Sequence, residues 1–271
     1  RFDTRILHGE GPLTDEILLH RNDESHLLAD GTSLMDARGD RIGALVVLHD
    51  VTQLKKLERI RKDFVANVSH ELRTPITSIK GFVETLNEGA LDDPDNARRF
   101  LGIILRHVDR LNAIIEDLMS LSRIEQENES GRIALESGSV CDVLSACEAV
   151  IRVKAGKTDV GLEFSCDETL RAQMNRQLLE QAVVNLLDNA IKFSESGTTV
   201  GISALARDGE VVIEVEDQGP GIAREHQERI FERFYRVDRA RSRKAGGTGL
   251  GLAIVKHIAQ AHGGHVSLKS S

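Results

Sequence analysis

The chain of 271 residues is long enough for two or more domains. It carries a formal net charge of −8 at pH 7, and only 3% of its residues are aromatic. A nucleic-acid-binding surface needs an excess of basic residues and, for single strands, aromatic side chains that stack on bases, so this class of partner is excluded. The composition instead indicates a globular protein with aliphatic cores.

Cysteine usage and hydropathy give two further expectations. Cys141, Cys147 and Cys166 are odd in number and form no CxxC pair, so we predict small, buried, reduced side chains. The longest apolar stretch, residues 42–48, is far too short to cross a bilayer. Arg1 is not a natural start, so we expect a piece of a longer protein, in which any membrane-spanning segment lies outside this chain.

The first 52 residues have a strand-like pattern. "DARGD" at 36–40 reads as a turn, and the run after it alternates through Ile42, Ala44, Val46 and Leu48. Alternation of this kind is typical of a half-buried strand. We therefore predict a short β-rich domain at 1–52.

From residue 53 the apolar residues recur at spacings of three and four as far as Leu86, which predicts a long helix. "NEGALDDPD" then breaks the pattern, and Asp93 followed by Pro94 is typical of a helix start. A second helix is predicted from about residue 95 to 127.

The second helix has an apolar seam with a heptad spacing. Its members are Leu101, Ile104, Val108, Leu111, Ile115, Leu118 and, at the last position, Leu121 or Ser122. A single helical hairpin cannot cover both of its seams from water, so we predict a homodimer that forms a four-helix bundle.

The polar residues 128–134 are interpreted as a linker. Beyond them, helix patterns at 140–155 and 175–193 alternate with strand patterns at 160–166, 198–207 and 210–217, and a last helix is followed by a strand pattern at 265–270. Mixed helices and strands with an adjacent strand pair predict an α+β two-layer sandwich at 135–271, with its last strand possibly truncated.

The stretch "FVANVSHELRTPITSI" at 64–79 carries chemistry on this first helix. His70 lies about 200° around the helix from the seam and therefore faces solvent, and Thr74 shares its face. Pro75 has no N–H to offer the carbonyl of Glu71, which predicts a bend. Glu71 could accept the imidazole proton and so make His70 nucleophilic, whereas the alternative is an ordinary solvated histidine.

A second candidate site lies in "QAVVNLLDNAIKF". Asn185, Asn189 and Lys192 share one helical stripe, which Gln181 extends. Asparagine is a poor residue in a helix interior, so two on one face suggest a task. Amide oxygens suit Mg²⁺ and a lysine suits phosphate, while a solvated helix face is the alternative.

Two glycine-containing segments complete the candidates. In "EVVIEVEDQGPGI", Asp217 follows the apolar row of a strand and is expected to point inward, where an adenine amino group would satisfy it beside Gly219 and Gly221. The alternative is a β-turn with a capping aspartate.

"AGGTGLGLAI" places glycines at a helix start, where free N–H groups bind phosphate, although a flexible hinge would also use them. The basic segment 236–248 before this start is suited to a mobile lid over an anion, and a solvated loop is its alternative.

Taken together, these motifs resemble those of the two-component sensor histidine kinases. "FVANVSHELRTPITSI" resembles the H box of that family, "NLLDNAIKFS" its N box, "DQGPGI" and "GGTGLGLAI" its glycine boxes, and "IFERFYRVD" its F box, in the family's order. The resemblance covers residues 53–271 and implies a dimeric phosphotransfer hairpin at 53–127 and a GHKL-type ATP-binding domain. The first 52 residues are similar to the end of a PAS sensor domain, and the phosphate-regulon sensors are the nearest branch.

The resemblance implies a role for each candidate residue. His70 would accept the phosphoryl group, Glu71 would orient or deprotonate it, Thr74 would position water for dephosphorylation, and Asn185 and Asn189 would hold Mg²⁺. The implied ATP-binding residues are Asn185, Asn189, Lys192, Phe193, Asp217, Gly219, Gly221, Ile222, Tyr235, Arg236, Gly247, Thr248, Gly249, Leu250 and Gly251.

The implied activity is autophosphorylation from Mg-ATP, followed by transfer to an aspartate in the receiver domain of a response regulator. The implied location is the cytoplasmic portion of a membrane-anchored bacterial protein. Two alternatives stay open: a GHKL-type ATPase without phosphotransfer, and a scaffold or phosphatase without kinase activity.

Overall fold

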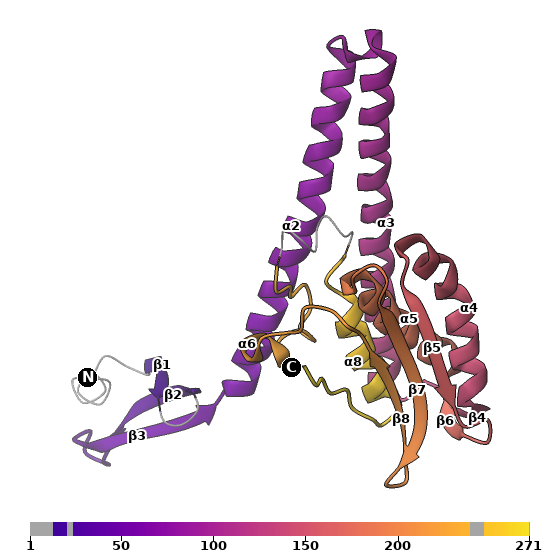
Figure 1. Cartoon of the computed structure of the whole chain (residues 1–271). Coiled ribbons are helices and arrows are strands. Elements are labelled where there is room, and N and C mark those ends of the chain that lie inside the picture. Colours follow the sequence, from indigo (N-terminus) through magenta and orange to yellow (C-terminus); the bar gives the residue numbers. More distant parts are fainter. Residues whose placement is uncertain (1–12, 21–23, 239–246, 271) are drawn as a thin grey trace. The chain divides into compact units, whose positions relative to one another are not determined.

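A computed structural model describes residues 13–20, 24–238 and 247–270 (Figure 1). The chain divides into two compact units, residues 1–70 and 71–271. Each unit is described by itself.

The first unit holds an antiparallel three-stranded sheet. Its strands are β1 (Leu13–His20), β2 (Glu24–Met35) and β3 (Arg41–Asp50), in that order across the sheet. The turn at 36–40 is confirmed, since Asp36 Oδ1 accepts hydrogen bonds from the backbone N–H groups of Arg38 and Asp40, both at 2.8 Å. The predicted β-rich character of this segment is therefore correct.

The expected half-burial of β3 is wrong. Ile42 is 68% exposed and Leu48 is 54% exposed. Alternation sorts side chains onto two faces of a strand, but a face becomes buried only when a second layer covers it. In the described part of this unit, no such layer covers the row.

Two hydrogen bonds join this sheet to the helix that follows. Asp50 Oδ1 accepts from the backbone N–H of Thr52 at 2.9 Å, and Thr52 Oγ1 accepts from the backbone N–H of His26 at 2.9 Å. The start of the helix is thereby fixed to the central strand.

The helical hairpin consists of α2 (Thr52–Asn87), a short 3₁₀ turn η1 (Ala90–Asp92) and α3 (Pro94–Glu129). The predicted start at Asp93 is confirmed, because its carboxylate accepts from the N–H groups of Asp95 and Asn96. Phe82 and Phe100 pack across the hairpin with ring centroids 5.4 Å apart. None of the described helices is both long enough and apolar enough to span a membrane.

The seam of α3 divides between two environments. Of the predicted seam, Leu121 is buried, together with Ile114 and Ile124 from outside the seam, whereas Leu101 and Ile115 are about half exposed, at 49% and 50%. The buried residues lie on the stretch of α3 that contacts α8. The exposed ones form an apolar face of the kind that a second hairpin would cover.

The remainder of the second unit is an α+β domain (Figure 1). Its elements are β4 (Glu136–Ser139), α4 (Val140–Thr158), β5 (Gly161–Cys166), β6 (Arg171–Met174), α5 (Arg176–Phe193), β7 (Thr199–Arg207), β8 (Glu210–Glu216), α6 (Arg224–Gln227) and α8 (Gly251–Ala261). Strands β5 and β7 are parallel and β7 and β8 antiparallel, in the order β5-β7-β8, while β4 and β6 form a separate antiparallel pair.

The core of this domain lies between α4, α5 and the three-stranded sheet. Leu144 and Leu187 from the helices and Val200 from β7 are fully buried in it. Val211, Ile213 and Val215 pack against this core from β8, as the alternation in that strand predicts. The two-layer sandwich inferred from the sequence is thus the fold that forms.

Two predictions about strands in this domain are wrong. Residues 265–270 are not a strand, although Val266 and Leu268 alternate with polar residues. A strand needs a neighbouring ladder, and β-propensity alone does not supply one. In the other direction, the four-residue strands β4 and β6 were not foreseen, because they are too short for a periodicity to register.

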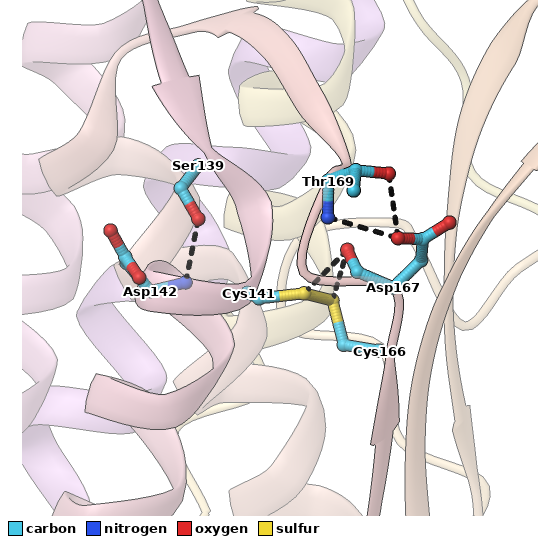
Figure 2. Close-up of a disulfide and its surroundings, with 6 residues drawn as sticks. All are labelled: Ser139, Cys141, Asp142, Cys166, Asp167 and Thr169. Atoms are coloured by element: carbon cyan, nitrogen blue, oxygen red, sulfur yellow. Dashed lines mark hydrogen bonds between the residues drawn. A yellow bond between two sulfur atoms is a disulfide. The ribbon is translucent and has the colours of Figure 1, made fainter.

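The prediction of three reduced cysteines is also wrong for two of them. Cys141, in the first turn of α4, and Cys166, at the end of β5, form a disulfide with Cα atoms 5.8 Å apart (Figure 2). Cys147 is free and buried, as expected. The pairing depends on β5 running back along α4, antiparallel to it, so that the start of the helix meets the end of the strand. The two cysteines are 25 positions apart, and their spacing in the sequence does not predict this contact.

Candidate functional site

The candidate nucleophile lies on the solvent side of α2. His70 and Thr74 are both exposed, as their helical position predicts, and the buried Pro75 follows one turn after His70. The helix runs unbroken through this proline. The predicted polar face is therefore present.

Glu71 connects this helix to two other parts of the second unit. Its Oε2 accepts a hydrogen bond from Arg110 Nη2 of α3 at 2.8 Å. The same oxygen lies 3.3 Å from Arg236 Nη2, in the segment that resembles the F box. The residue beside His70 is thus in contact with the domain that carries the candidate phosphate-binding residues.

The polar stripe of α5 is hydrogen-bonded to α3 and to α8. Gln181 Nε2 donates to Ser120 Oγ of α3 at 2.7 Å, and Asn185 Nδ2 donates to the carbonyl of Gly251 at 3.4 Å. Asn189 and Lys192 follow on the same stripe, both half-buried. This arrangement is more specific than the solvated helix face considered above.

Lys192 is held in an unfavourable environment for a cation. Burial, together with the nearby charges of Lys154, Arg236 and Arg110, lowers the pKa of its ammonium group to about 8. A bound anion would relieve both costs. The local charge therefore favours phosphate beside Lys192.

Asp217 does not occupy the position that its strand pattern predicts. Strand β8 ends at Glu216, and Asp217 is exposed rather than buried. Its Oδ1 accepts from the backbone N–H of Gly219 at 2.8 Å, as in the turn that was the alternative. Alternation fails here because the chain leaves the sheet one residue before the carboxylate.

Gly219 lies where no larger residue fits. A Cβ atom there would be 2.7 Å from Asp217 Oδ1 and 3.2 Å from the carbonyl oxygen of Phe193. The glycine loop consequently packs directly on the end of α5, next to Lys192. Gly221 adopts a φ of 73°, a conformation that favours glycine.

The second glycine segment packs on the F-box segment. Phe234 N–H donates to the carbonyl of Gly249 at 2.8 Å, and Arg236 Nη2 donates to the carbonyl of Gly247 at 2.6 Å. Gly249 has a φ of 80°, and a Cβ on it would be 3.1 Å from the Phe234 Cα. The expected lid includes residues 239–246, which lie outside the described residues, as does Gly246.

Three further candidates for the nucleotide site, Tyr235, Ile222 and Leu250, are each held by contacts of their own. Tyr235 Oη is 2.7 Å from His226 Nδ1, and its ring lies under the Arg229 guanidinium at 4.3 Å. Ile222 N–H donates to Ser270 Oγ at 2.8 Å. Leu250 is completely buried before α8, and it anchors the glycine segment to the core.

Sequence reasoning missed a polar row on α3, which contacts α2 at one end and the α+β domain along the rest. Arg110 contacts Glu71, Asp117 contacts Thr248, and Glu125 contacts both Arg233 and His257. Burial raises the pKa of Asp117 and lowers that of His257. A sequence signal for this row exists, because residues 110, 117 and 125 are polar and seven and eight positions apart, which places them on one face of the helix. The apolar seam of the same helix does not include them.

Comparisons with known proteins match both the helical hairpin and the α+β domain to protein families. Residues 60–127 match the family model of the His Kinase A (phospho-acceptor) domain. Residues 174–271 match that of the histidine kinase-, DNA gyrase B- and HSP90-like ATPase. The two matches cover the hairpin with His70 and the domain with the candidate nucleotide site.

Two curated relatives are sensor proteins. The chain is 42% identical over 231 residues to the sensor-like histidine kinase SenX3 of Mycolicibacterium smegmatis, covering 85% of this chain and 59% of the relative. It is 34% identical over 241 residues to the sensor protein SrrB of Staphylococcus aureus, covering 88% of this chain and 41% of SrrB. The chain thus spans about half the length of the curated relatives it matches.

Solved structures share the architecture. The Acinetobacter baumannii histidine kinase AdeS matches with a TM-score of 0.54 and 26% identity over 71% of this chain and 86% of that one. Histidine kinase ThkA, solved in complex with the response regulator TrrA, matches with a TM-score of 0.60 over 96% of this chain and 75% of that one. At 23% identity, the second likeness concerns the fold alone. With both domain families present in their order, the chain belongs to the sensor histidine kinases.

Proposed function

We propose that this chain phosphorylates its own His70 from ATP and then donates the phosphoryl group to an aspartate of a response regulator. The observation that carries the proposal is the contact of Glu71, the neighbour of His70, with Arg236 of the nucleotide domain. A phosphoacceptor helix and a phosphate-binding segment that share an ion pair have a direct route for transfer.

The transfer itself needs little covalent chemistry from the protein. The bond between the γ-phosphorus and the ADP oxygen breaks, and its electron pair leaves with ADP. A ring nitrogen of His70 forms the new P–N bond, and the proton on the other ring nitrogen passes to the Glu71 carboxylate. Lys192 and Arg236 would hold the phosphates and offset their charge.

The residues of α5 fit a magnesium ion. Asn185 and Asn189 offer amide oxygens, which are the hard ligands that Mg²⁺ accepts. In the described part of the chain no group of three or more His, Cys, Asp or Glu side chains could hold a metal, so the remaining ligands would be phosphate oxygens and water. When bound, the ion would neutralise charge on the phosphates.

The adenine site is proposed at the loop after β8. Asp217 would accept a hydrogen bond from the adenine amino group, with Gly219, Gly221 and Ile222 beside the ring. Phe193, Tyr235, Thr248 and Leu250 would complete the surroundings of the nucleotide, and Gly247, Gly249 and Gly251 would form the base of the lid.

The assembly and partners belong to the same proposal. The exposed residues on the α3 seam, Leu101, Val108 and Ile115, support pairing of two hairpins into a four-helix bundle. The phosphoryl acceptor would be a receiver domain, and Thr74 would position water for its dephosphorylation. The parent protein would be anchored in a bacterial membrane with this portion in the cytoplasm.

Incubation with γ-labelled ATP and magnesium tests the proposal. Label that survives alkali, is lost in acid and is missing from His70→Gln is the expected result. His107→Gln on α3 is the matched control and should still be labelled. Phosphate release without labelled protein would instead identify the ATPase alternative. If neither released phosphate nor labelled protein is formed, the scaffold alternative is supported.

A further inference from the structure

Arg110 of α3 is the strongest contact of the Glu71 carboxylate. Its Nη2 donates to Glu71 Oε2 at 2.8 Å, whereas Arg236 Nη2 lies 3.3 Å from the same oxygen. The Arg110 side chain is only 12% exposed and that of Glu71 is 25% exposed. The pair is thus largely withdrawn from water, where its geometry has the most effect.

Two guanidinium groups lie on the Glu71 carboxylate, one from α3 and one from the F-box segment. Arg110 and Arg236 both contact it, and both lie near enough to Lys192 to depress the pKa of that lysine. Among the described residues, Arg110 Nε is buried and has no acceptor. An ion pair that served only to join α2 to α3 would need Arg110 alone, so the contact with Arg236 adds a link from Glu71 to the nucleotide domain.

The two guanidinium groups are not held equally. Arg236 Nη2 also donates to the carbonyl of Gly247 at the shorter distance of 2.6 Å, so it is tied to the nucleotide domain. Arg110 belongs to the hairpin itself. If Arg236 turns towards incoming phosphate, as the proposed function requires, Arg110 is the group that remains on Glu71.

We propose that Arg110 is a positioning residue for the phosphotransfer reaction, which keeps the Glu71 carboxylate beside His70 while Arg236 moves to the phosphates. With Oε2 held by Arg110, the Glu71 carboxylate would accept the imidazole N–H. Arg110 would thereby fix the ring of His70 through Glu71, without touching ATP. This inference rests on the proposed function and adds a residue to it.

The test compares full-length chains that carry Arg110→Ala, Arg110→Lys and Arg106→Ala. Arg106 lies one turn earlier on α3 and is exposed, so its variant controls for loss of an arginine from this helix. Initial rates of His70 labelling are measured over a range of ATP concentrations, together with thermal unfolding. If Arg110→Ala does not fold, Arg110→Lys, which keeps a charge at this position, carries the same comparison.

The inference predicts a loss in kcat and not in KM. Arg110→Ala should label about 10- to 100-fold more slowly with an ATP KM close to wild type, because the ATP site is untouched. Added guanidinium ion should restore part of the rate, which a purely structural role would not allow. The double variant Glu71→Gln with Arg110→Ala should be no slower than Glu71→Gln alone.

Several results would overturn the inference. One is a wild-type labelling rate in a folded Arg110→Ala, and another is a raised KM with unchanged kcat. If the rate losses of the two single substitutions multiply in the double variant, Arg110 does not act through Glu71. Wild-type chain that binds ATP but is never labelled would refute the proposed function, and the role of Arg110 with it, so the two failures are distinguishable.

Discussion

Thr248 Oγ1 donates a 2.6 Å hydrogen bond to the carboxylate of Asp117, although the two residues are 131 positions apart. The contact joins the base of the glycine segment before α8 to the middle of α3. Since burial raises the pKa of Asp117, the hydroxyl partially compensates a carboxylate that is otherwise poorly solvated. The helical hairpin and the α+β domain therefore share a polar contact as well as an apolar one.

Removal of this hydroxyl should destabilise the second unit. We expect Thr248→Val to lower the free energy of unfolding by about 1–3 kcal/mol, because Asp117 would lose a donor that offsets its desolvation. Urea unfolding measures the loss. The control is Thr77→Val on the exposed face of α2, which should change the free energy of unfolding by less than about 0.5 kcal/mol. Equal effects of the two substitutions would contradict a stabilising role of the bond between Thr248 and Asp117.

ATP affinity should depend on pH through Lys192. Its pKa of about 8 means that the ammonium is lost as pH rises above that value, and the proposed contact with phosphate would be lost with it. Because bound phosphate favours the protonated form, binding should be coupled to proton uptake, and affinity should fall as pH rises from about 8. Calorimetry in buffers of different ionisation enthalpy measures both quantities.

Lys192→Arg is the matched variant for this pH dependence. Arginine stays charged at every accessible pH, so the fall in affinity above pH 8 should flatten even if affinity at neutral pH changes. A wild-type affinity that is constant between pH 7 and 9.5 would contradict a phosphate contact of Lys192. An unchanged slope in Lys192→Arg would assign the pH dependence to another group.

The disulfide should contribute measurably to stability. Cys141 and Cys166 are 25 positions apart, and closing a loop of this size is worth about 3–4 kcal/mol in the chain-entropy description. Reductant should therefore lower the unfolding free energy of the wild type, and Cys141→Ser should make the chain insensitive to reductant. Cys147→Ala, which changes the free thiol, should keep the wild-type response, and a wild type indifferent to reductant would refute the pairing.

The reduced form has one hydrogen bond available to it. The carbonyl oxygen of Asp167 lies 2.9 Å from Cys141 Sγ and 3.6 Å from Cys166 Sγ (Figure 2). A thiol at position 141 would donate to this carbonyl and recover a small part of the loss. The Asp167 side chain separately holds the turn, since its Oδ1 accepts from Thr169 N–H at 2.9 Å and Oγ1 at 2.7 Å.

Gly249→Ala should damage the nucleotide site more than the fold. Its φ of 80° disfavours other residues, and the new methyl group would meet Phe234 Cα at 3.1 Å and Arg236 Nε at 3.0 Å. We expect a destabilisation of about 1–3 kcal/mol and displacement of Arg236. The variant should therefore remain folded but lose ATP binding. Gly197→Ala, also at positive φ but with nothing within 4 Å, is the control that carries backbone strain alone.

The regular parts of this fold could be read from the sequence because they repeat. The hairpin shows a helical period over more than thirty residues in each arm, and Asp93 with Pro94 marks the helix start chemically. The inward face of β8 was foreseen for the same reason. Asp217 was not, because the period says nothing of the residue at which a strand leaves its sheet.

The contacts that assemble the site depended on tertiary packing. No spacing rule joins Glu71 to Arg110, Asp117 to Thr248, or Cys141 to Cys166, since each pair is distant in sequence and meets only after the helices have docked. The motifs predicted which residues are candidates for a function. The partners that hold these residues in place can be identified only from the three-dimensional structure.

The most direct test of the account is to locate the transferred phosphoryl group by peptide mass spectrometry at alkaline pH after incubation with Mg-ATP. We expect one phosphoryl group on the peptide that contains His70, and none when Asn189→Ala removes a proposed magnesium ligand. ADP formation without a phosphoryl group on that peptide, or a phosphoryl group on another histidine, would contradict it.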